Sequence, residues 1–129
     1  MLWLWMTTLA WANPVVIEAE SPGVVRVRAS SVPVFVPACG GVGWERFDEK
    51  AGEFVAIPTR PCGPLKPAIV VGSDGLQATL EATLPSPGLH VVRSVVVFSE
   101  KCAENKPFPL AGCTGIVHLF GPNQVVRRD

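Results

Sequence analysis

The sequence has little charge and no excess of either sign. Among its 129 residues, Lys and Arg number 11, Asp and Glu number 11, and the formal net charge is zero. Proteins that bind phosphate backbones concentrate Lys and Arg on one surface, so this balance argues against nucleic acid as a partner. The hydrophobic share of 48% also excludes a disordered chain, because disorder accompanies low hydrophobicity and high net charge.

Catalytic signatures are absent as well. The sequence contains no G-x-S-x-G, H-E-x-x-H, G-x-x-x-x-G-K-[ST] or G-x-G-x-x-G motif. Its two histidines, His90 and His118, make a poor metal site without a carboxylate or thiolate partner. Nothing in the sequence places either one beside Asp48 or Asp74, and a catalytic triad is defined by geometry. We therefore expect no enzymatic activity, no metal and no cofactor.

No window of eleven residues has the apolar stripe of a helix, whereas Val-rich runs alternate with turns containing Pro and Gly. The segment 76–84 alternates apolar and polar residues throughout, and 89–98 is the longest β-type run and the expected central strand. Segments 42–47 and 54–57 read as a hairpin around a loop at 48–52, with Trp44 and Phe54 near the core. About seven to nine short strands at such spacing predict an antiparallel sandwich or barrel.

Residues 1–12 are apolar and uncharged. Ala10 and Ala12 stand where a signal peptidase needs small residues, which predicts a signal peptide and a mature single domain at 13–129. The alternative is a buried N-terminal strand. No Lys or Arg precedes the apolar run, so either the start codon lies further upstream or the signal is weak. The run is shorter than the roughly 20 residues of a membrane-spanning helix, and no other segment is long and apolar enough, so no span is expected in the mature chain.

Four cysteines follow, an even number that predicts disulfides in a small exported domain. Four cysteines allow three pairings, of which Cys39–Cys62 with Cys102–Cys113 makes each bridge enclose one hairpin-like unit. No two cysteines lie within four residues of each other, which argues against the close pairs typical of zinc sites. Disulfides persist in oxidising compartments, so the expected location is secreted or periplasmic.

Several short motifs follow one another between residues 32 and 97: an extended strand ending in Cys, a Trp-containing hairpin, a second Cys, an alternating strand, and a Pro-Gly turn followed by a strand with Arg. In that order, the motifs lie at residues 34–39, 44–47 with 52–54, Cys62, 76–84 and 87–93. In these motifs the chain resembles bacterial secreted immunoglobulin-like domains. The resemblance implies an immunoglobulin-like antiparallel β-sandwich without an assigned activity.

The chain departs from that family in two places. It contains no tyrosine, so His90 stands where the family has a Tyr whose hydroxyl bonds the backbone at a corner. The segment between Cys102 and Cys113 is a long insertion.

The expected function is that of a secreted non-catalytic module that binds a protein or envelope partner through loops or edge strands. A disulfide-closed loop is pre-organised for binding, and the side chain of Phe108 would either anchor a partner or cover the end of the core. The candidate binding residues are Lys101, Glu104, Lys106, Phe108 and Leu110. The second hypothesis is a small secreted protease inhibitor that uses the rigid segments 60–67 and 101–113.

Overall fold

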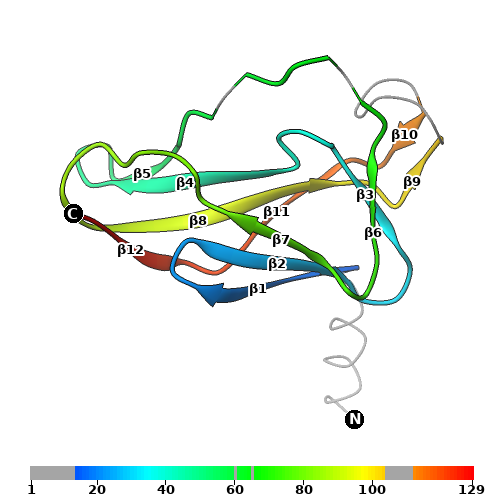
Figure 1. The fold of residues 1–129 in the computed structure, drawn as a ribbon, viewed down its shortest axis with the longest axis horizontal. Coiled ribbons are helices and arrows are strands. Elements are labelled where there is room, and N and C mark those ends of the chain that lie inside the picture. Colours follow the sequence, from blue (N-terminus) through cyan, green and yellow to red (C-terminus); the bar gives the residue numbers. More distant parts are fainter. Residues whose placement is uncertain (1–13, 60, 65, 104–111) are drawn as a thin grey trace, which may run out of the picture.

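The computed structural model describes residues 14–59, 61–64, 66–103 and 112–129. These residues form β-strands and no helix, which confirms the all-β antiparallel class (Figure 1). The described strands number twelve, more than the seven to nine expected, partly because two-residue strands form where a loop was predicted. They are β1 (Val15–Ser21), β2 (Val24–Ala29), β3 (Val34–Val36), β4 (Val42–Asp48), β5 (Glu53–Ala56), β6 (Ile69–Val71), β7 (Leu76–Thr79), β8 (Gly88–Phe98), β9 (Lys101–Cys102), β10 (Cys113–Thr114), β11 (Val117–Phe120) and β12 (Gln124–Arg128).

The strands are divided among four antiparallel sheets. One sheet has the order β1-β2-β7, and the largest has the order β11-β8-β4-β5, with β12 pairing β8 on the same edge as β11. The pairs β3-β6 and β9-β10 form two small sheets. The predicted central strand is confirmed, because β8 pairs with β4 along one edge and with β11 and β12 along the other.

The predicted hairpin between β4 and β5 is present, with a shorter loop than expected. Asp48 pairs with Glu53 across the ladder, so the connection spans 49–52. The Asp48 carboxylate accepts hydrogen bonds from the backbone N–H groups of Lys50 at 3.0 Å and Ala51 at 3.4 Å. Gly52 closes the turn at φ +70°, a conformation that glycine adopts without steric cost.

The alternating segment 76–84 is a strand only as far as Thr79. The ladder ends there because its partner runs out: Val24, the first residue of β2, is opposite Thr79. One further hydrogen bond joins the Leu80 N–H to the Gly23 carbonyl at 2.7 Å. The alternation of exposure nevertheless continues to the buried Leu84, so the pattern predicted the side-chain directions correctly and the length of the ladder incorrectly.

The hydrophobic core lies between the sheets and is built mainly from valine. One cluster gathers around Phe98, and a second around Trp44, which is 5% exposed and therefore occupies the core as expected. The valines that are fully buried are Val25, Val27, Val34, Val36, Val92 and Val96. Phe54 does not join them: it lies opposite Phe47 on the outer side of the large sheet. The expectation for Phe54 was wrong because the shorter loop shifts the register by one residue, which reverses the face.

Candidate functional site

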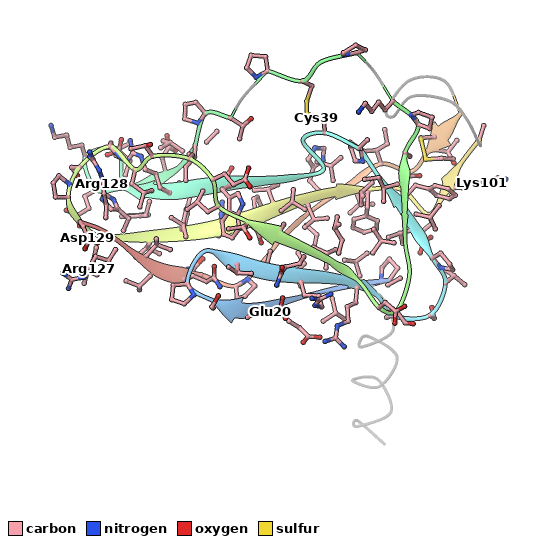
Figure 2. All side chains as sticks on the ribbon, viewed as in Figure 1. Glu20, Cys39, Lys101, Arg127, Arg128 and Asp129 are labelled. Carbon is pink, nitrogen blue, oxygen red and sulfur yellow. A yellow bond between two sulfur atoms is a disulfide. The ribbon has the colours of Figure 1, made fainter. Side chains whose placement is uncertain are left out.

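The predicted binding loop is described only at its base. Lys101 is exposed on β9, and the neighbouring Cys102 lies opposite Cys113 on β10 and forms a disulfide with it. Figure 2 shows Lys101 at the opposite end of the molecule from the C-terminal residues. The other four candidates, Glu104, Lys106, Phe108 and Leu110, lie outside the described residues, and the binding role of this loop stays a prediction.

Both disulfides have the expected pairing. Cys39 is joined to Cys62, which links the turn before β4 to the segment after β5. Figure 2 labels Cys39 on the side of the molecule along which the segment after β5 runs. Among the described residues no cysteine is free.

The two histidines do not form a common site. His90 lies opposite Val126 near the start of β8, whereas His118 lies opposite Val97 near the end of that strand. The His90 ring instead donates from Nε2 to the Ser86 carbonyl at 2.7 Å. In the described part of the chain no three His, Cys, Asp or Glu side chains gather as a metal site would require, nor is any helix there long and apolar enough to cross a membrane.

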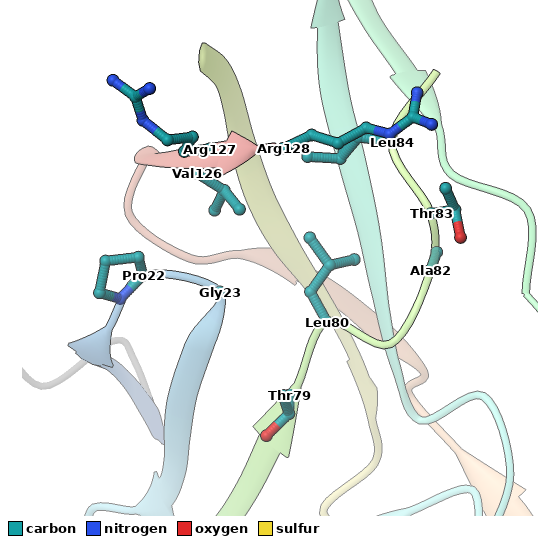
Figure 3. A pocket seen from close by; sticks show the side chains of 10 residues that line it. All are labelled: Pro22, Gly23, Thr79, Leu80, Ala82, Thr83, Leu84, Val126, Arg127 and Arg128. Atoms are coloured by element: carbon teal, nitrogen blue, oxygen red, sulfur yellow. The ribbon is translucent and has the colours of Figure 1, made fainter. Parts of the chain in front are cut away.

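A cavity of about 200 Å³ opens between the β1–β2 turn, the segment after β7, and β12 (Figure 3). Leu80 and Val126 point toward one another across it, while the Arg127 side chain leads away. Small-molecule sites usually measure about 300–1,000 Å³ and bring several polar groups together. This cavity is smaller and mostly aliphatic where Leu80 and Val126 meet, so it is a weak candidate site.

The outer side of the large sheet carries the strongest candidate. Alternate residues of β8 point away from the core there, and the ladder register assigns their neighbours on β4, β5, β11 and β12 to the same side. We call this surface the apolar face. Its side chains are those of Glu45, Phe47, Phe54, Ala56, Leu89, Val91, Arg93, Val95, Val97, His118, Phe120, Val125 and Arg127.

Arg93 is at the centre of the apolar face. Its guanidinium lies 4.0 Å from the ring centroid of Phe54 and 3.8 Å from that of Phe120, and 2.8 Å from a Glu45 carboxylate oxygen. Phe47 packs edge-on against Phe54 with 5.5 Å between ring centroids. Contacts between a cation and aromatic rings are attractive because the ring faces are electron-rich. The positive charge is therefore neutralised within the face, and the surrounding aromatic rings are held in place.

The apolar side chains around this centre are exposed. Leu89 is 64% exposed, Val125 54% and Phe120 51%. An antiparallel sheet of a soluble domain usually has one face in the core and the other in water, with polar residues on the wet face. The apolar face breaks that rule over several adjacent strands, whereas single exposed hydrophobic residues are ordinary.

The outer side of the β1-β2-β7 sheet obeys the rule. Arg26 pairs with Glu20 and Arg28 with Glu18, each at 3.3 Å. The Gln77 amide donates to the Glu20 carboxylate at 3.0 Å, and this hydrogen bond, together with the nearby Arg26, lowers the pKa of Glu20. The outer faces of the two sheets therefore differ in chemistry: the face of the β1-β2-β7 sheet carries paired charges in water, and the face of the large sheet is hydrophobic and exposed.

Sequence reasoning missed the apolar face, although the sequence contains a signal for it. The segment 89–98 is apolar at both odd and even positions, which is typical of strands that are buried on both sides. The structure buries Val92, Val96 and Phe98 on one side and leaves Leu89 and Val91 exposed on the other. The other residues of the face could not be found in this way. Phe47, Phe54 and Phe120 lie far from segment 89–98 in the sequence or on other strands, and only the pairing of the strands brings them to the same face. Comparison of the chain with protein-family models, with curated proteins and with solved structures found no match.

Proposed function

We propose that this chain is an exported, non-catalytic module of immunoglobulin-like fold that binds a protein or envelope partner through the apolar face. The observation that carries the proposal is the exposure of Leu89, Val125 and Phe120 around the fixed centre at Arg93. Large exposed hydrophobic patches on soluble domains mark interaction surfaces, because leaving them in water costs free energy that a partner recovers. Aromatic and Arg side chains are also the residues that most often dominate binding energy.

The order of the strands supports the immunoglobulin-like fold. In such sandwiches, strands A, B and E share one sheet, and C, F and G share the other, with extra strands beside C in some classes. Here β1, β2 and β7 share one sheet, and β4, β8 and the β11–β12 pair share the other, with β5 beside β4. The chain order of these strands is compatible with that topology, while β3-β6 and β9-β10 form separate pairs.

The core supports the same fold. Immunoglobulin domains bury a Trp on strand C against a disulfide between strands B and F. Trp44 on β4 is in one buried cluster with Val25 on β2 and Val92 on β8, so two valines take the places of the cysteines. The corner residue of the family lies two positions before the second cysteine. His90 has that position relative to Val92, and its bond to the Ser86 carbonyl fulfils the role of the tyrosine hydroxyl.

Export is supported by the two disulfides, Cys39–Cys62 and Cys102–Cys113. Structural disulfides are rare in reducing compartments and common in small exported domains, where they supplement a limited core. The compartment matters for the function, because the partner has to be sought among envelope and extracellular proteins.

A photo-crosslinking amino acid at Phe120 would test the proposed face in cells that export the full chain. We expect adducts after irradiation, because Phe120 lies within the surface that the partner would cover. The matched control is the same amino acid at Val16, which is 44% exposed on the charged side of the β1-β2-β7 sheet. Equal yields of adducts at the two positions, or none at Phe120 in folded protein, would contradict the proposal.

A further inference from the structure

We infer that the partner of the apolar face is a second copy of this chain, so that the protein is a symmetric dimer with its two large sheets face to face. The inference rests on the proposed function, because it names the occupant of the same surface. Three properties of the face favour a second copy: its charge, its extent and its shape.

Charge comes first. The central pair, Arg93 and Glu45, is neutralised within the chain, and both side chains are only about a quarter exposed. Apart from Arg127 at the margin on β12, the face has no permanently charged side chain that could select an acidic or a basic partner. A neutral, hydrophobic partner surface is therefore required, and a second copy has one. Because the formal net charge of the chain is zero, two copies also approach without long-range repulsion.

The second property is the area of the apolar face. With neighbouring strands about 4.8 Å apart and a rise of about 3.3 Å per residue, the large sheet presents a face on the order of 600 Å². A standard stable interface takes about 800 Å² from each partner. The face alone is therefore smaller than a standard contact surface and reaches that size only together with its margin, whereas a short peptide would leave much of it in water.

Shape comes third. Two sheets that pack face to face keep their strands within about 30° of each other, an angle that follows from the twist of both sheets. Two copies of one sheet have the same twist. A two-fold axis between them makes the contact self-complementary, so every residue of the face contributes twice. In such a dimer both faces of the large sheet would be covered: the inner face packs on the core of its own copy, and the outer face would pack on the large sheet of the second copy.

Sedimentation velocity of the exported, oxidised chain over about 1–100 µM would test the inference, since these concentrations bracket micromolar dissociation constants. We expect a dimer at the upper end. Val125→Lys and Leu89→Lys each place two ammonium groups in the contact and are expected to weaken the dimer at least tenfold. Val16→Lys is the matched control, because Val16 and Val125 have similar exposure on strands in different sheets, and it is expected to leave the dimer unchanged.

Folding of each variant is checked by the midpoint of urea unfolding at about 1 µM, the low end of the range, because dimerisation at higher concentration would itself raise the midpoint. Only variants with the wild-type midpoint under that condition are compared. A wild-type chain that stays monomeric at about 100 µM, or a dimer that survives both Lys substitutions, would overturn the inference. If the purified chain is monomeric and the Phe120 crosslinker still forms adducts with another protein or with lipid, the binding function stands and the dimer is excluded. A monomer without adducts removes both.

Discussion

At the scale of single residues, Arg93 organises the apolar face. It is the only side chain for which the described contacts include two aromatic rings and a carboxylate, those of Phe54, Phe120 and Glu45. A lysine at this position would keep the charge and lose the planar group that stacks on both rings. The stability of the folded chain should therefore depend on the guanidinium itself and not only on its charge.

We expect Arg93→Lys to lower the free energy of unfolding by about 1 kcal/mol, because cation–ring contacts are worth about 0.5–1 kcal/mol each at exposed sites and lysine retains part of the ion pair. Arg28→Lys is the control. Arg28 and Glu18 are nearly half exposed, at 44% and 46%, and such pairs contribute little. Urea unfolding of the three proteins measures the difference, and equal losses in both variants would show that the stacking contributes nothing.

At the scale of strands, most of the β-structure was predicted correctly from the sequence. The face to which Phe54 points was predicted incorrectly. Strand positions follow from local properties, namely the alternation of residues and the turn residues between runs, so β4, β5 and β8 occur close to where they were expected. The direction of Phe54 depends on the register of the β4–β5 hairpin, and a loop shorter by one residue reverses it. The stop of β7 at Thr79 depends on where its partner strand begins, which no local pattern encodes.

The step from β11 to β12 depends on one glycine. Both strands pair with β8 on the same edge, and the chain crosses between them at Gly121, whose N–H donates to the Ser94 carbonyl at 2.9 Å. A β-carbon on Gly121 would overlap the Ser94 hydroxyl oxygen and come within 2.9 Å of an Ile17 methyl group. The Ser94 hydroxyl is buried and has no hydrogen-bond partner among the described residues, so it fills space at a cost in free energy.

We expect Gly121→Ala to destabilise the fold by about 1–3 kcal/mol, as overpacking does in close-packed cores. Ser94→Ala is expected to be neutral or stabilising, because it removes an unsatisfied hydroxyl and leaves the bulk of the side chain. The double variant should recover part of the loss, because the nearer of the two clashes is gone. Thermal and urea unfolding of the three variants measure this coupling, and strictly additive effects would exclude direct contact between the two positions.

At the scale of the whole molecule, two disulfides supplement a core made mostly of valine. The sequence predicted their pairing, because each bridge encloses one local unit. It also predicts cleavage before Asn13, a position outside the described residues. Compartment, processing and oxidation state are linked, so a single measurement on the exported product addresses all three.

We expect the intact mass of the chain exported by a bacterium to correspond to a start at Asn13 and to increase by about four hydrogens on reduction, two for each disulfide. Reduction should also lower the free energy of unfolding by roughly 2–4 kcal/mol per bridge. Mass spectrometry before and after reduction, with unfolding under both conditions, checks these expectations. An uncleaved product with four thiols would contradict export and return the cysteines to consideration as metal ligands or reactive groups.

The central position of β8 has a consequence for how the chain is made. One edge of β8 pairs with β4, which precedes it, and the other pairs only with β11 and β12, which follow it. While the ribosome is still adding the last strands, β8 would therefore have an open edge of unpaired backbone groups. We expect the large sheet to be completed only after the residues of β12 have emerged. Such an order would suit the proposed export, in which a polypeptide crosses a membrane channel unfolded and folds on the far side.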